Sequence, residues 1–152
     1  MDRSANMRAI RSKDMRPELA VRCLVHRMGY RYRLHRHDLP GRPDLVFPGR
    51  HKVIFVHGCF WHQHNRCRLA HTPRSNLDYW QPKLARTKVR DKKNRAALKS
   101  AGWGVLVIWE CETSDDSAVS TRIRTFLSRA TNKQETRRHR PVDQVRVRPL
   151  LQ

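Results

Sequence analysis

Apolar residues recur with the spacing of an amphipathic helix in two parts of the chain. Between Pro17 and Gly29 they fall at i, i+3, i+4 and i+7, at Val21, Leu24, Val25 and Met28. Proline suits the first turn of a helix and glycine ends helices, so we expect a helix over 17–28. A similar stripe follows the acidic segment 114–117, at Val119, Ile123, Phe126 and Leu127. It predicts a last helix that ends at about Ala130.

Three other stretches have the pattern of β-strands. Tyrosine and leucine alternate with arginine over 30–34, which predicts a strand with one basic face in solvent. Apolar runs at 45–47 and 52–56 flank the turn segment 48–50 and predict a hairpin. The run 105–109 is apolar throughout, so we expect a buried strand at the centre of a sheet.

The remaining segments lack a regular apolar pattern. Residues 1–16 are polar and basic and predict an arm, and residues 131–152 predict a mobile basic tail. Residues 58–76 predict a long irregular loop that needs something besides a core to hold it. We therefore expect one domain over 17–130.

The charge of the chain indicates a polyanionic partner. Its 33 Lys and Arg against 13 Asp and Glu leave a formal net charge of +20. Much of this charge lies on a polar helix expected over 78–101, where residues 83–99 contain eight basic residues and one acid, Asp91. Nucleic acid is the commonest polyanion, and an anionic membrane is the other candidate. No apolar stretch approaches about 18 residues, so we expect a cytoplasmic protein, associated with the nucleoid when bound to DNA.

Five Cys and His residues fall within positions 57–67, which is the composition of a metal-binding loop. Cysteines in a reducing compartment are better candidates for metal ligands or core residues than for disulfides. A structural zinc ion takes four such ligands, and the best set here is Cys59, His64, Cys67 and Cys111. The alternative is a pair of buried thiols beside solvated histidines. Cys23 has no Cys or His at ligand spacing, and we expect it in the core or at its boundary.

A second candidate site lies around Asp44, directly before the first strand of the hairpin. Magnesium prefers oxygen ligands and needs only one or two carboxylates when phosphate and water supply the rest. His57 and His62 would then lie near enough to polarise or deprotonate an attacking water. Alternatively, Asp44 caps a turn and the histidines are surface residues.

Two aromatic pairs, Phe60-Trp61 and Tyr79-Trp80, lie next to these candidates. Aromatic rings that are difficult to bury in a loop can act as a wedge between base pairs, especially at a weakened pair. The alternative for each pair is a place in the core.

Taken together, these motifs resemble the very short patch repair (Vsr-type) DNA mismatch endonucleases, from about Met7 to Ala130. The resemblance rests on His57-Gly58-Cys59-Phe60-Trp61-His62, with 39–44 (LPGRPD) before it and 109–111 (WEC) after it. The arm, Asp91 and Gly102-Trp103 also match the family.

This resemblance implies an α/β, restriction-endonuclease-like fold, with a central mixed sheet flanked by helices and a structural zinc site. It implies an Mg²⁺-dependent enzyme that nicks one strand 5′ to the thymine of a T:G mismatch in double-stranded DNA. Such mismatches arise by deamination of 5-methylcytosine. We further expect a monomer, with other mismatch-repair proteins as partners.

The resemblance also implies roles for individual residues. Asp44 would bind Mg²⁺ directly, together with the backbone carbonyl of Val56. His62 would activate the water, His57 would assist near the metal-bound waters, and Glu18 would act through water. Asp91 would support the site, and the wedge and zinc residues would be Phe60, Trp61, Trp80, Cys59, His64, Cys67 and Cys111.

The sequence also leaves two other classes of function open. A non-catalytic, zinc-containing module that binds distorted DNA would have the same charge and the same Cys/His loop. An RNA-binding, ribosome-associated protein would explain the charge, but not the combination of Asp44, His57 and His62. Both the enzyme and the module should bind DNA in a salt-dependent way, so only turnover with Mg²⁺ separates them. A preference for RNA over mismatched DNA would favour the RNA-binding protein.

Overall fold

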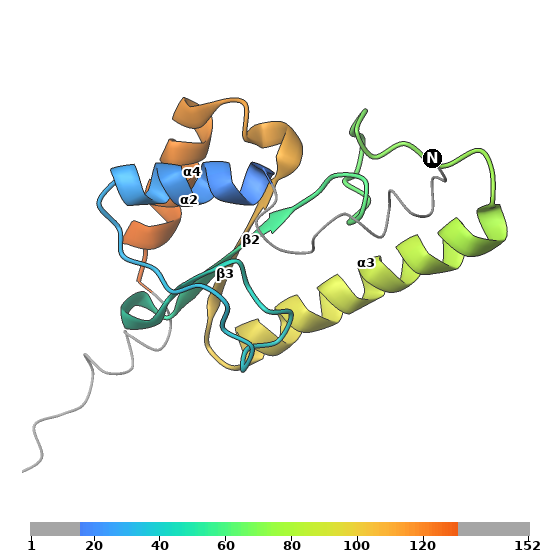
Figure 1. Cartoon of the computed structure of the whole chain (residues 1–152). Coiled ribbons are helices and arrows are strands. Elements are labelled where there is room, and N and C mark those ends of the chain that lie inside the picture. The colour runs from blue at the N-terminus through green and yellow to red at the C-terminus, as the bar shows by residue number, and fades with distance from the viewer. Residues whose placement is uncertain (1–15, 131–152) are drawn as a thin grey trace, which may run out of the picture.

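The computed structural model describes residues 16–130, so the expected tail and nearly all of the expected arm lie outside the described residues. This part of the chain contains both helices and strands (Figure 1). Within it, no helix is both long enough and apolar enough to cross a membrane. In chain order the elements are α2 (Arg16–Arg27), β1 (Leu45–Phe47), β2 (Lys52–His57), α3 (Leu77–Ser100), β3 (Gly104–Trp109) and α4 (Asp116–Ser128), with 3-10 turns at Pro48–Arg50 and Glu110–Glu112.

The three strands form one mixed sheet in the order β1-β2-β3. β1 and β2 are antiparallel, with Leu45 opposite Ile54, which confirms the predicted hairpin. β2 and β3 are parallel, and their register pairs His57 with Trp109 at the last position of both strands. A mixed sheet joined by helices was expected, and the structure confirms it.

Helices cover both faces of this sheet. In Figure 1, α2 and α4 lie over one face and α3 lies along the other. Alternate residues of a strand point to opposite faces, so the apolar strands supply two cores. The larger core includes Val25, Ile54, Ile108 and Ile123, and the smaller includes Val46, Val53, Phe55 and Leu98.

The placement of 105–109 at the centre of the sheet was wrong. Among the described strands, β3 lies at an edge and β2 lies between its two neighbours. Ile108 alone of the β3 residues is buried, and the others are half-buried. The apolar run of β3 therefore reflects packing against helices on both faces of the sheet. It does not show that the strand has a neighbouring strand on each side.

The strand predicted over 30–34 was also wrong. Only Arg33 makes a β-bridge there, with Val46, through hydrogen bonds of 2.8 and 3.0 Å. The alternation is nevertheless present in the burial, because Tyr32 and Leu34 pack against the larger core while the arginines are exposed. β1 has three residues and is followed directly by Pro48, so it offers little edge with which a longer partner could pair.

Candidate active site and Cys/His cluster

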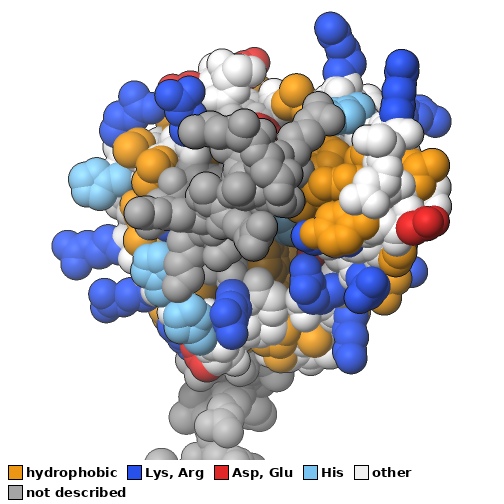
Figure 2. Space-filling model, turned by 45° about the vertical axis from the view of Figure 1, so that its right-hand side comes forward, with side chains coloured by type: hydrophobic (Ala, Val, Ile, Leu, Met, Phe, Trp, Pro, Cys, Tyr) orange, Lys and Arg blue, Asp and Glu red, His pale blue; other side chains and the backbone are white. Residues whose placement is uncertain are grey.

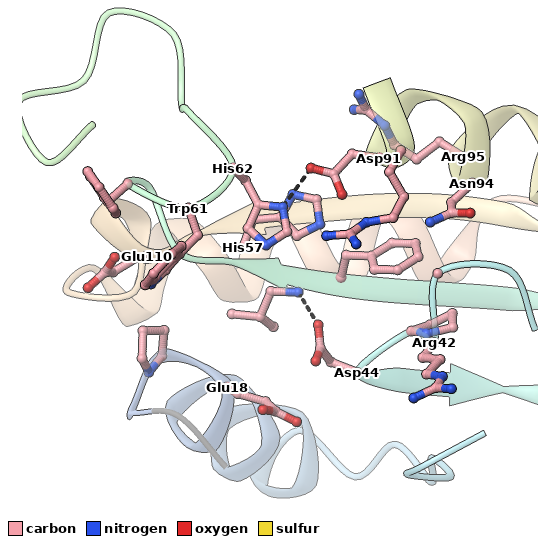
Figure 3. Close-up of a pocket in the computed structure, with 18 of the residues that line it drawn as sticks. Glu18, Arg42, Asp44, His57, Trp61, His62, Asp91, Asn94, Arg95 and Glu110 are labelled. Carbon is pink, nitrogen blue, oxygen red and sulfur yellow. Dashed lines mark hydrogen bonds and ion pairs between the residues drawn. The ribbon is translucent and has the colours of Figure 1, made fainter. Parts of the chain in front are cut away.

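The ends of the three strands meet at one edge of the sheet, and a cleft of about 940 Å³ opens there. Asp44 precedes β1, which runs antiparallel to β2, so it lies beside the residues that end β2. β3 is parallel to β2, so Glu110 reaches the same edge. The cleft is lined by all the predicted catalytic residues and by Asp91, that is, by Glu18, Asp44, Val56, His57, His62 and Asp91 (Figure 3).

The Asp44 carboxylate is held by the backbone of β2. Its Oδ2 accepts a hydrogen bond of 2.6 Å from the Val56 amide. Burial raises the pKa of Asp44 to about 7, although the Val56 hydrogen bond acts in the opposite direction; the nearby Glu18 charge also raises it. A charged carboxylate in this position is therefore costly unless a cation is close.

The donor groups around Asp44 are oxygen atoms, which are the ligands that a magnesium ion prefers. Oxygen groups of Asp44 and Glu18 line the same cleft, which is large enough for phosphate and water to complete the coordination. Asp44 does not belong to any group of three or more close His, Cys, Asp or Glu donors among the described residues. Magnesium tolerates such a sparse protein site because it keeps several waters.

His57, His62 and Asp91 form a second group in the cleft. The two imidazole rings are stacked with their centroids 3.8 Å apart and their planes 6° apart. His62 Nδ1 lies 2.6 Å from Asp91 Oδ2, so the carboxylate of α3 orients the ring of the loop residue (Figure 3). When Nδ1 carries the hydrogen of this bond, Nε2 is left with a lone pair that can accept a proton.

The electrostatics of this group keep its members in different charge states. Burial, together with the neighbouring His62, lowers the pKa of His57 to about 3, so His57 stays neutral at physiological pH. Burial alone would raise the pKa of Asp91, but the hydrogen bond to His62 and the charges of the neighbouring histidines and Arg90 together outweigh it, so the pKa lies below its ordinary value. Asp91 is thus an anion beside His62, an arrangement suited to stabilising a protonated imidazole.

Glu18 reaches the cleft from the first turn of α2. It is buried, and it forms an ion pair with Arg22 one turn later in the helix. The predicted role of Glu18 requires it to lie near Asp44, and both residues line the same cleft. The charge of Glu18 also raises the pKa of Asp44.

The predicted zinc ligands converge on one point. One donor atom from each of the four residues lies within 4.8 Å of the others. His64 Nδ1 is 3.6 Å from Cys59 Sγ and 3.4 Å from Cys111 Sγ. Tetrahedral zinc with ordinary bond lengths places such S and N atoms about 3.5 Å apart, so the donor set fits this ion. The Cys/His cluster, as we call it below, consists of Cys59, His64, Cys67 and Cys111.

Hydrogen bonds from the residues that follow β3 also hold the loop after β2 at the Cys/His cluster. The Cys111 amide donates to Cys59 Sγ at 3.4 Å, and Glu110 Oε2 accepts from the Cys59 amide at 3.1 Å. Burial raises the pKa of Cys59 to about 12, so this thiol needs a metal ion to become a thiolate. Cys23 is exposed on α2 and lies apart from the cluster, so its expected core or boundary position was wrong.

The predicted wedge residues form an aromatic cluster at the rim of the cleft. The Phe60 ring lies 5.2 Å from Trp61 and 5.5 Å from Trp80, and all three side chains are half-buried. The ammonium group of Lys83 lies over the rings of Trp61, Trp80 and Tyr79. The rings are thus neither in the core nor isolated, and a cation lies beside them.

Basic side chains surround this part of the surface. Figure 2 shows hydrophobic side chains gathered between projecting Lys and Arg side chains. The basic residues of α3 are largely exposed, as a helix that contacts phosphates requires.

Sequence reasoning missed several residues of the site. Asn94 and Arg95 line the cleft and follow Asp91 by three and four positions, so helical periodicity could have placed them on its face. Glu110 lines the cleft and also bonds the loop. Trp109 contacts two histidines, and the resemblance gave it no role.

Comparisons with known proteins agree with this geometry. The profile of the family described as "DNA mismatch endonuclease Vsr" matches residues 1–68. A type II nicking enzyme, V.XorIIP of Xanthomonas oryzae pv. oryzae, is 55% identical over 121 residues, which are 80% of this chain and 88% of that protein. The DNA mismatch endonuclease Vsr of Escherichia coli K12 is 37% identical over 130 residues, which are 82% of this chain and 83% of that protein.

A solved structure shows the same fold. The catalytic domain of the homing endonuclease I-Bth0305I superimposes with a TM-score of 0.51 at 22% identity, covering 74% of this chain and 94% of that domain. The predicted restriction-endonuclease-like α/β fold is thereby confirmed. The relatives, with their high coverage, show the family: this chain belongs to the Vsr family of DNA mismatch endonucleases.

Proposed function

We propose that this protein nicks one strand of double-stranded DNA on the 5′ side of the thymine in a T:G mismatch, by Mg²⁺-dependent hydrolysis. The observation that carries the proposal is the meeting of Asp44 and the His62–Asp91 pair in one cleft, beside half-buried aromatic rings. Membership of the mismatch endonuclease family supports the reaction class. We infer the specificity for the thymine of a T:G mismatch from the resemblance of this chain to the family.

In this proposal Asp44 holds the catalytic Mg²⁺ together with the backbone carbonyl of Val56. The ion would supply Lewis-acid stabilisation of the charge that develops on the phosphate. The chain's part is to present a half-buried carboxylate whose oxygen is fixed by the Val56 amide. Glu18 completes the acidic side of the cleft through water.

His62 is the proposed general base. Its Nδ1 is engaged by Asp91 at 2.6 Å, so Nε2 is the atom that takes a proton from the attacking water. Asp91 then stabilises the imidazolium that results. His57 stays neutral and stacks on His62, where it can hydrogen-bond waters without adding a competing positive charge.

Mismatch recognition is assigned to the aromatic cluster of Phe60, Trp61 and Trp80. Its half-buried rings lie at the rim of the cleft that holds the catalytic groups. Insertion of aromatic side chains costs least where a base pair is already weak, which favours a mismatch over a paired site. The basic arm of 1–16, the exposed residues of α3 and the tail of 131–152 would add affinity that depends on salt.

The Cys/His cluster is proposed to bind a structural zinc ion. It ties the loop that carries Phe60, Trp61 and His62 to the end of β3. We further propose that the domain of 17–130 acts as a monomer at the nucleoid, because a single nick at an asymmetric mismatch needs no two-fold symmetry.

The test is strand-specific nicking of end-labelled duplexes that differ only in T:G or C:G at one position, with and without Mg²⁺. We expect a nick 5′ to the mismatched thymine with wild-type protein, and no nick with Asp44→Ala, which should still bind. Tight binding without cleavage over several flanking sequences would instead identify a non-catalytic DNA-binding module.

A further inference from the structure

A continuous series of aromatic contacts joins the Cys/His cluster to the catalytic histidines. The His64 ring stacks on Trp109 with centroids 4.2 Å apart and planes 9° apart. The same indole meets His57 edge-to-face at 5.3 Å, and His57 stacks on His62 at 3.8 Å. The series ends at Asp91, which bonds His62.

The topology of the sheet places Trp109 in this position. His57 and Trp109 are register partners at the last position of two parallel strands, so their side chains project side by side from the same face. That face is the one covered by α3, because Phe55 and Val107, two positions earlier in each strand, pack with Leu98 of α3. Cys111 follows Trp109 by two residues, so one short segment serves both the cluster and the cleft.

His62 depends on such support more than the other catalytic candidates do. Asp44 and His57 belong to or directly adjoin strands, whereas His62 lies in the loop between β2 and α3. The described contacts of its ring are the stack on His57 and the bond to Asp91. A general base must keep its acceptor atom within hydrogen-bond reach of the attacking water, and a displacement of about 1 Å can cost up to about 10²-fold in rate.

We propose that Trp109 is a positioning residue that makes the placement of His57 and His62 depend on an ordered Cys/His cluster. When His64 is bound to the metal ion, its ring is held in one orientation and the stacked indole of Trp109 is held with it. The contact between the indole and the His57 ring is then fixed as well. Loss of the metal would free His64 and loosen the catalytic pair, even though no residue of the Cys/His cluster lines the cleft. Only the predicted effect on the nicking rate rests on the proposed function; the structural coupling does not.

The first test compares Trp109→Leu, which removes the aromatic faces, with Trp109→Phe, which keeps one. Trp103→Leu is the matched control, because Trp103 also stacks on a histidine, His51 at 3.9 Å, and adjoins the other end of β3. Neither Trp103 nor His51 lines the cleft. Each variant is measured for bound zinc, for affinity toward a T:G duplex, and for the single-turnover nicking rate at saturating protein.

We expect Trp109→Leu to slow single-turnover nicking about 10–100-fold with affinity and zinc content close to wild type. Trp109→Phe should stay within about threefold of wild type, and so should Trp103→Leu. A wild-type rate in Trp109→Leu would overturn the proposal. Equal slowing in Trp103→Leu would also overturn it, since the effect would then be general destabilisation.

A second variant covers the case in which Trp109→Leu fails to fold. His64→Cys keeps a four-ligand zinc site and removes the ring that stacks on Trp109. With zinc retained, we expect it to slow nicking while leaving duplex affinity unchanged; an unchanged rate would count against the proposal.

An activity-free readout separates this inference from the proposed function. The ¹H–¹⁵N spectra of the His57 and His62 rings report their mutual stacking through ring-current shifts. We expect these signals to move or broaden in Trp109→Leu and in zinc-stripped wild type, but not in Trp103→Leu. If wild type nicks no duplex and the shifts still follow this pattern, the proposed function fails while the coupling stands. Unmoved ring signals in Trp109→Leu would refute the coupling.

Discussion

Asp44→Asn should stabilise the protein when no Mg²⁺ is present, although it abolishes the proposed metal site. The substitution keeps an oxygen that can accept the Val56 amide and removes the charge that burial disfavours. Wild type has to ionise a carboxylate inside the cleft, whereas the variant holds a neutral amide of the same shape. A catalytic position is thereby predicted to carry a cost in stability.

The size of this cost follows from the pKa of Asp44. A rise from 3.8 to about 7 corresponds to about 4 kcal/mol, at about 1.4 kcal/mol per pH unit. Because the cleft admits water to part of the carboxylate, we expect a smaller gain for Asp44→Asn, about 1–3 kcal/mol at pH 8.

The gain should depend on pH in a defined direction. Well below pH 4 the carboxyl group is neutral in both the folded and the unfolded states, so no penalty exists. Between about pH 4 and 7 the unfolded chain releases this proton and the folded protein retains it, so wild type loses stability as the pH rises. The advantage of Asp44→Asn should therefore be small at pH 4, grow across this window and level off above about pH 7.

Urea unfolding of both proteins at pH 4, 6 and 8 measures this advantage. Mg²⁺ is omitted from the buffer, and no chelator is added, because chelators would strip the proposed zinc ion. A gain at pH 8 that persists unchanged at pH 4 would refute the electrostatic reasoning, as would no gain at pH 8. Millimolar Mg²⁺ should then raise the stability of wild type and leave Asp44→Asn unchanged, and stabilisation of both would place the ion elsewhere.

Three further substitutions test separate parts of the structure. Asp91→Asn should slow single-turnover nicking about 10²-fold or more, since His62 loses the anion that orients it, and should leave the affinity for a T:G duplex within about threefold. Cys111→Ser should lower both zinc content and melting temperature, and full zinc occupancy would contradict its assignment as a ligand. Lys52→Met should cost about 1–3 kcal/mol in urea unfolding, because the buried ammonium group donates to two carbonyls at the end of α4; an unchanged midpoint would show those bonds to be unimportant.

Much of the fold could be predicted from the sequence because local signals and tertiary packing agree. The helix expected over 17–28 is found at Arg16–Arg27, and the one expected over 78–101 at Leu77–Ser100. The hairpin needed only two apolar runs and a Pro-Gly turn. The segment 30–34 failed because alternation reports which side chains face the core, whereas a strand also requires a partner edge of sufficient length, and β1 is short.

The candidate site was predictable in its residue types and less so in its contacts. Clustered Cys and His residues indicate a metal because few other environments collect them at such spacing. The partnership of His62 with Asp91 spans 29 positions, and no local pattern connects a loop histidine to an acid in the middle of a basic helix. The contacts of Trp109 could not be predicted either, because an aromatic residue at the end of an apolar strand looks like an ordinary core residue in the sequence.

The arrangement of strands explains how such distant residues meet without a long irregular scaffold. An antiparallel β1–β2 pair puts the start of β1 beside the end of β2, and a parallel β2–β3 pair puts both carboxyl ends at that same edge. Asp44, His57 and Trp109 therefore meet as a consequence of topology alone. The loop after β2 must also begin at this edge, so the Cys/His cluster forms where strand ends already converge. A metal ion there would fix the loop at the point where a small movement has the largest effect on His62, because only two residues separate His62 from Cys59.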